Sequence, residues 1–122
     1  MSAFPTNLYI EEILDLIKTD TPYLALYTTN PGAGDTGTEV TGGSYARQAV
    51  TFGTITGGSM SNTGVISFTG LPTATITHWG VRNASSAGDL RVFGALNSNV
   101  ATISGDEVSF PVGNLQISLA GS

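Results

Sequence analysis

The fold class is indicated most directly by residues 64–96, which read GVISFTGLPTATITHWGVRNASSAGDLRVFGAL. Apolar and polar side chains alternate with a period of two along Gly64–Thr69, Thr73–Asn83 and Asp89–Leu96, as in half-buried β-strands. The segments between them, Gly70–Pro72 and Ala84–Gly88, are rich in residues that accept tight bends. This stretch therefore predicts three strands joined by turns.

The same period continues on both sides of this stretch. Further strands are expected over Tyr23–Thr28, Gln48–Thr56, Glu107–Val112 and Leu115–Leu119. Many short strands with frequent turn signals are typical of antiparallel sandwiches and barrels. The sequence predicts a mainly β protein: a single antiparallel β-sandwich, jelly-roll or Ig-like, over about 23–119, within one domain spanning 1–122.

One amphipathic helix is expected before the strands, over about 7–18. Its apolar side chains recur at helical spacing, namely at Ile10, Ile13, Leu14 and Ile17. Thr6 or Asn7 is placed to cap the start of the helix. Pro22 favours a stop just before it, because the residue preceding a proline avoids helical geometry.

The stretch 29–45 shows neither period and is rich in Gly and Thr. A loop this long in a small domain either packs on its own body or reaches to a neighbouring subunit. Long ordered loops of compact domains are disproportionately functional, so the second alternative is favoured.

The low content of charged residues excludes some classes of binding partner and favours others. Charged residues make up 11 % of the chain, the net charge is −5, and the four cations are scattered. Such a chain offers no basic stripe for nucleic acid. A neutral, Thr-rich surface is easier to bury against partner subunits than an ionic one. No apolar run has the length of a membrane span, and Met1–Phe4 lacks the pattern of a secretion signal, so we expect the chain to be made and kept in a cytosol.

The residue types that carry chemistry are few, and the prediction is a protein that is not an enzyme and has no cofactor or metal. The absence of cysteine excludes a thiolate zinc site and a cysteine nucleophile. Gly32–Gly37 matches G-x-G-x-x-G, but a dinucleotide site needs a helix directly after it, and Thr38–Gly43 follows instead. His78, the sole histidine, alternates with Trp79, so one of the two faces the core; the sequence leaves open which.

Arg47 lies where the long loop rejoins a strand, and two roles stay open for it. Its guanidinium could brace the loop through Glu39 or Tyr45, or it could anchor an interface, where Arg and Tyr are enriched. The helix face could likewise contact a neighbour or cover the domain's own core. The predicted interface residues are Gly32, Asp35, Glu39, Tyr45, Arg47, Leu8, Ile10, Ile13 and Ile17.

An ordered set of segments resembles a family of small tailed-phage virion proteins of the tail-fibre, minor tail or capsid-decoration type. The resemblance is carried by the expected N-terminal helix and by the segments Tyr23–Pro31, Glu39–Val40, Gly43–Gln48 with Phe52, Ile76–Val81, and Gly105–Phe110 with Leu115. The resemblance covers most of the chain. It implies a virion component without catalytic residues.

Taken together, these features predict a capsid decoration protein that binds the outside of the assembled head and stabilises it. The expected partners are the major capsid protein or tail proteins and further copies of this chain, with no nucleic acid and no membrane. A tail component, either a minor tail protein or a fibre-base module, is the first alternative. A glycan-binding module that uses Trp79 is the second, and an exposed indole would favour it.

Overall fold

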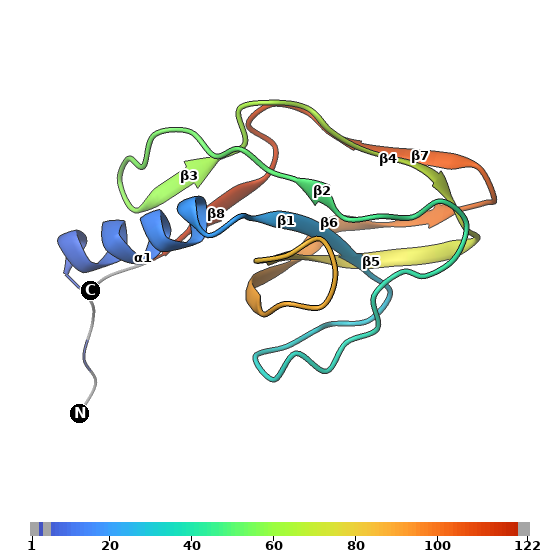
Figure 1. Cartoon of the computed structure of the whole chain (residues 1–122), viewed down its shortest axis with the longest axis horizontal. Helices are drawn as coiled ribbons and strands as arrows, with labels where there is room; N and C mark the ends of the chain where they lie inside the picture. Colours follow the sequence, from blue (N-terminus) through green and yellow to red (C-terminus); the bar gives the residue numbers. More distant parts are fainter. Residues whose placement is uncertain (1–2, 4–5, 120–122) are drawn as a thin grey trace.

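The computed structural model describes residue 3 and residues 6–119, and its architecture is mainly β with one helix (Figure 1). The elements in chain order are α1 (Asn7–Thr19), β1 (Tyr23–Tyr27), β2 (Gln48–Ala49), β3 (Ser59–Ser61), β4 (Ile66–Leu71), β5 (Ala74–Arg82), β6 (Leu90–Thr102), β7 (Asp106–Phe110) and β8 (Gln116–Ser118).

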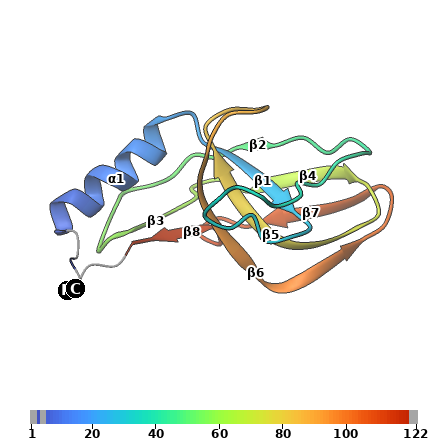
Figure 2. The ribbon, with the colours of Figure 1, turned by 90° about the horizontal axis from the view of Figure 1, so that it is seen from below.

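The strands form two layers. One layer is an antiparallel sheet in the order β2-β1-β5-β6, and the other consists of the ribbons β4-β7 and β3-β8. In Figure 1 the ribbon β4-β7 lies above the four-stranded sheet, and Figure 2 shows the molecule turned so that the long, bent β6 runs along one side. The predicted mainly β, antiparallel sandwich is confirmed.

The hydrophobic core fills the space between these layers. Both layers and the helix contribute buried side chains, among them Leu14, Leu24, Leu26, Met60, Phe68, Ile76, Val81 and Leu115. The buried amide of Asn62 has full hydrogen bonding, because it donates to the carbonyls of Gly64 and Pro111 and accepts from the backbone of Leu115. Asn62 therefore joins the two ribbons without leaving an unpaired polar group in the core.

Helix α1 begins after Thr6, whose hydroxyl accepts a hydrogen bond from the Tyr9 amide at 3.3 Å. It lies beside the β3-β8 ribbon at one end of the sandwich (Figures 1 and 2). Near its end, the Lys18 ammonium donates to the Gly53 carbonyl at 3.0 Å. The helix thus packs on its own chain.

Most strand bounds differ from the sequence expectation by one or two residues, and three differences are larger. The expected strand Gln48–Thr56 is regular only in β2, although Val50 and Phe52 beyond it are buried. The short β3 has too few residues for a period to show and was missed. β6 continues six residues past Leu96, because its far end pairs with the start of β5 after an irregularity between Ala95 and Val100.

Candidate assembly surfaces

The long loop is fixed by a brace of three side chains. Arg47 donates from Nε to Glu39 Oε2 at 2.9 Å and from Nη2 to Glu39 Oε1 at 2.8 Å, the two-bond geometry suited to a guanidinium and a carboxylate. The Tyr45 hydroxyl donates to Glu39 Oε2 at 2.6 Å and accepts from the Leu26 amide at 3.0 Å. The carboxylate therefore links the loop to strand β1.

The same arginine ties the loop to the turn after β5. Arg47 Nη1 donates to the carbonyls of Ala84 and Ala87 at 3.1 and 2.7 Å. The side chain is only 9 % exposed, so its donors are used inside the chain. The loop also pairs with β1 through the Val40 amide and the Leu26 carbonyl, 2.9 Å apart. The structure thus shows the brace, one of the two roles left open for Arg47, and a contact of Glu39, Tyr45 and Arg47 with a neighbouring subunit stays a prediction.

The brace shifts the pKa of each of its members. Burial alone would raise the pKa of Glu39, but the hydrogen bonds from Arg47 and Tyr45 act the other way, and the pKa lies below its ordinary value of 4.5. Burial, followed by the bond to Glu39, raises the pKa of Tyr45 well above its usual range. The bond to Glu39 raises the pKa of Arg47. The brace therefore holds one carboxylate and one guanidinium charged at neutral pH.

A second arginine holds the tip of the loop. Arg82 donates from both terminal nitrogens to the two Asp35 oxygens, at 2.9 and 2.8 Å, and from Nη1 to the Tyr27 hydroxyl at 3.0 Å. The hydrogen bond from Arg82 lowers the pKa of Asp35. Gly32 begins the bend with φ +65°, a conformation that favours glycine. Gly32 and Asp35 remain partly accessible on the loop, so their place in an interface stays a prediction.

The helix face is split between the core and the surface. Ile10 and Ile17 are buried in the protein's own core, so the expectation that they contact a neighbour is corrected: they form a lid on the sandwich. Leu8 is 67 % exposed and Ile13 is half-buried, which leaves both available. Sequence reasoning missed two further residues, Tyr9 and Leu16.

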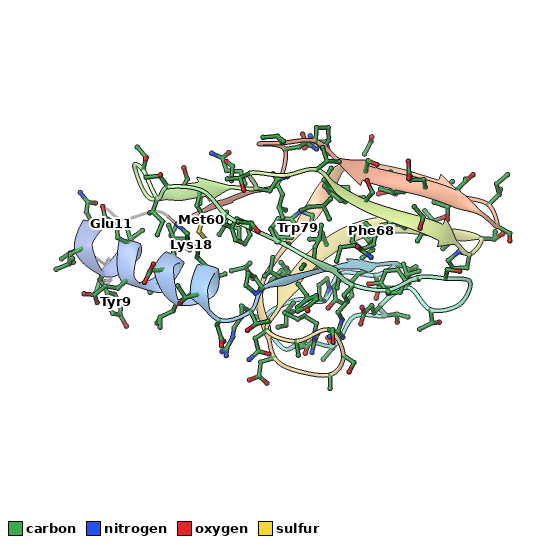
Figure 3. The ribbon with its side chains drawn as sticks, turned by 45° about the horizontal axis from the view of Figure 1, so that its top comes forward. Tyr9, Glu11, Lys18, Met60, Phe68 and Trp79 are labelled. Atoms are coloured by element: carbon green, nitrogen blue, oxygen red, sulfur yellow. The ribbon has the colours of Figure 1, made fainter. Side chains whose placement is uncertain are left out.

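Tyr9 and Leu16 extend the apolar face beyond what the core covers. They are 57 % and 68 % exposed, and together with Ile13 they occupy positions i, i+4 and i+7, a spacing that could have predicted a second apolar stripe. Figure 3 shows Tyr9 on the side of the helix opposite Met60. We call Tyr9, Ile13 and Leu16 the outer stripe.

The sandwich is open along β6. A groove there is lined by Trp79, Arg91, Val92, Phe93, Gln116, Ile117, Ser118 and Leu119. Arg91 also borders a separate depression beside Ile13 and Leu16, so it stands between the groove and the outer stripe. Trp79 is half-buried and packs against the core. Of the two neighbours Trp79 and His78, it is therefore Trp79 whose side chain faces the core. Its ring lies over Gly94, where a Cβ atom would be 2.7 Å from the indole.

The other candidates for chemistry remain separate from one another. Gly32–Gly37 is followed by irregular backbone and not by a helix. His78 shares a 2.7 Å hydrogen bond with the hydroxyl of Thr77. Within residue 3 and residues 6–119, no three His, Asp or Glu side chains are grouped to hold a metal ion. The one helix of this part of the chain is too short to cross a membrane.

Comparison with known proteins identifies the family of the chain. No curated protein matches the chain. The model of a protein family described as Podophage GP4 fiber I protein gp80 matches residues 3–118, nearly the full length of the sequence. The match confirms the resemblance to tailed-phage virion proteins and selects its tail-fibre type. The chain therefore belongs to the podophage GP4 fiber I protein gp80 family and is a protein of the phage virion.

Proposed function

We propose that this protein is a structural subunit of the phage tail fibre that acts by binding other tail proteins and not by catalysis. The observation that carries the proposal is the family match over residues 3–118. The surface fits that role: it carries few charges, and three exposed large apolar side chains, Leu8, Tyr9 and Leu16, gather on α1. Surfaces of this kind are easier to bury in an assembly than ionic ones.

The use of the charged side chains supports a role without catalysis. Arg47 and Arg82 are held by Glu39 and Asp35 in contacts that position loops. The one imidazole, that of His78, has the Thr77 hydroxyl as its side-chain partner, whereas general acid–base catalysis usually needs a second ionisable group beside the first. The arrangement thus favours structural use of these groups.

The outer stripe is the surface that we assign to a neighbouring tail protein. Tyr9, Ile13 and Leu16 form an apolar row beside the row of the helix that is anchored in the core by Leu14 and Ile17. A row at this spacing suits an apolar groove or a second helix of a partner. Anchoring keeps the helix rigid, so that little conformational entropy is lost on binding.

Two other functions predicted from the sequence are less well supported. Capsid decoration requires binding across the head lattice, whereas the description of the matching family names a fibre. Glycan binding through Trp79 would be favoured by an open indole face, yet the ring is half-buried over Gly94. Tail-fibre assembly therefore remains the proposal, and location in the particle is its test.

Cryo-electron microscopy of the source phage tests the location. Density that fits this domain at the tail would support the proposal, and density repeated over the head lattice would overturn it in favour of decoration. Phage complemented with the Leu16→Lys variant should incorporate much less of the protein. Val65→Lys is the matched control, because Val65 is 64 % exposed but lies before β4, away from the helix. Equal incorporation of both variants would remove the outer stripe from the proposal.

A further inference from the structure

The inference starts from β6, the longest strand of the sandwich. β6 spans thirteen residues and lies at the edge of the four-stranded sheet, where β5 is its neighbour. The other edge is formed by β2, which has two residues. A long edge strand presents a row of unpaired backbone donors and acceptors, and natural proteins usually protect such an edge against pairing.

The direction of the free backbone groups follows from the strand register. The Leu26 amide donates to the Tyr45 hydroxyl, and the Leu26 carbonyl accepts from Val40, so both groups point away from β5. Trp79 lies opposite Leu26, and its backbone groups must therefore point to β6, where Gly94 is its partner. The backbone groups of Gly94 are thus used within the sheet.

The residues on either side of Gly94 have the opposite orientation. Successive residues of a strand alternate in the direction of their backbone groups, so Phe93 and Ala95 point theirs out of the sheet. Among the described residues, these groups have no backbone hydrogen-bond partner beyond the edge. Both side chains are exposed, and that of Phe93 is 40 % exposed although it is large and apolar.

The usual protective features are largely missing from this edge. Between Arg91 and Asp106 the sequence contains no charged residue and no proline. The irregularity between Ala95 and Val100 bends the far half of the strand and leaves 90–95 as its regular part. A neutral, proline-free edge with an exposed Phe is suited to pairing with another strand.

The side chains of residues 90–95 are suited to pairing with the same segment of a second copy of the chain. We propose that two copies of the chain pair through β6 in antiparallel fashion, with the two-fold axis at Gly94. In this register Phe93 of each copy lies beside Ala95 of the other, so that a large side chain packs over a small one. Up to about four backbone hydrogen bonds form between the copies.

The lack of charge along β6 also favours a second copy of the chain as the partner. The neutral stretch beyond Arg91 brings no like charges together when it pairs with itself, and Arg91 is balanced by Asp20 at 2.8 Å. Pairing also extends the apolar groove of Trp79 and Phe93 across both copies. An isologous contact of this kind closes on itself and stops at two copies. The proposal does not depend on where in the virion the protein lies.

The test is the mass of the purified full-length protein in solution over a concentration series, measured by analytical ultracentrifugation. The wild type should approach twice the chain mass of 12.5 kDa as its concentration rises. Ala95→Lys should raise the dimer dissociation constant by about tenfold or more, because lysine on an edge strand opposes pairing. Ala49→Lys is the matched control, since Ala49 is an exposed alanine on the other edge strand, and it should leave the dimer intact.

A second measurement keeps the result interpretable if a variant folds poorly. In wild-type protein, the amides of Phe93 and Ala95 should exchange with solvent more slowly as concentration rises. A monomer at all concentrations, a dimer that survives Ala95→Lys in folded protein, or a trimer would each overturn the two-fold pairing. A failure of this test would leave the tail location untouched, because cryo-electron microscopy of the phage tests that independently.

Discussion

The two edges of the four-stranded sheet differ in length, in charge and in what covers them. At the β2 edge the strand has two residues, and the Glu39–Arg47 brace holds the long loop and the turn after β5 beside it. At the β6 edge the strand has thirteen residues, and one of them, Arg91, is charged. One edge is closed by the chain itself, and the other is left open.

This difference shows how a chain with few charges uses them. All four cations contact acceptors of their own chain: Lys18 the Gly53 carbonyl, Arg47 Glu39, Arg82 Asp35, and Arg91 Asp20. Two of these contacts fix loops that cover the sheet next to its closed side. The charges that would otherwise protect the open edge are therefore used elsewhere, and that edge is neutral.

The largest effect should come from breaking the brace. Arg47→Ala removes the partner of a half-buried carboxylate together with two hydrogen bonds to backbone carbonyls, and it should lower the free energy of unfolding by about 2–4 kcal/mol. Arg91→Ala is the control at the open edge, because its ion pair is exposed and should contribute less than about 1 kcal/mol. Urea denaturation measures the free energy of unfolding of both variants. Equal losses in the two would contradict the difference between the closed and the open edge.

A smaller loss is expected where the open edge meets the core. In Gly94→Ala the new methyl group would lie 2.7 Å from the indole of Trp79, so the ring must move, at a cost of about 1–3 kcal/mol. The emission of the single tryptophan should shift with it. Gly64→Ala is the control, because nothing lies within 4 Å of its added Cβ. An unchanged spectrum of Gly94→Ala would show that the ring does not depend on this contact.

Acid should loosen the closed edge before the rest of the sandwich. The folded pKa of Glu39 lies below its unfolded value, so its stabilisation is present above pH 4.5 and is lost as the pH falls through the folded pKa. In Glu39→Gln this contribution is missing at every pH. The difference in unfolding free energy between wild type and Glu39→Gln should therefore shrink between pH 7 and pH 3, and a constant difference would exclude this role.

The smallest effect on stability should come from the edge lysines. Ala95→Lys and Ala49→Lys replace exposed alanines, and each should change the free energy of unfolding of the monomer by no more than about 0.5 kcal/mol. Denaturation at low concentration, where the chain is monomeric, measures this. A loss above 2 kcal/mol in Ala95→Lys would mean that the substitution damages the sheet itself, and exchange protection of the wild type would then be the decisive test of pairing.

Sequence patterns located most elements, and the failures have physical causes. The period of two indicated β1, β4, β5, β7 and β8 to within a few residues, because each has one face on the core. It failed for Val50 and Phe52, which are buried from irregular backbone, and for β3, which is too short to show a period. For the candidate site, the sequence offered Glu39 or Tyr45 as partners of Arg47, but it gave no sign of the backbone contacts with Leu26, Ala84 and Ala87.

The sequence by itself determined the mainly β class, the helix with its core-facing row, and a surface with few charges, because these follow from local periodicity and composition. Only the tertiary structure decided that Arg47 and Glu39 act within the chain, that Trp79 packs inward over Gly94, and that β6 is an open edge. The reason is physical: a period reports which side of a strand faces the core, whereas strand order and the partners of long side chains depend on contacts between residues far apart in sequence.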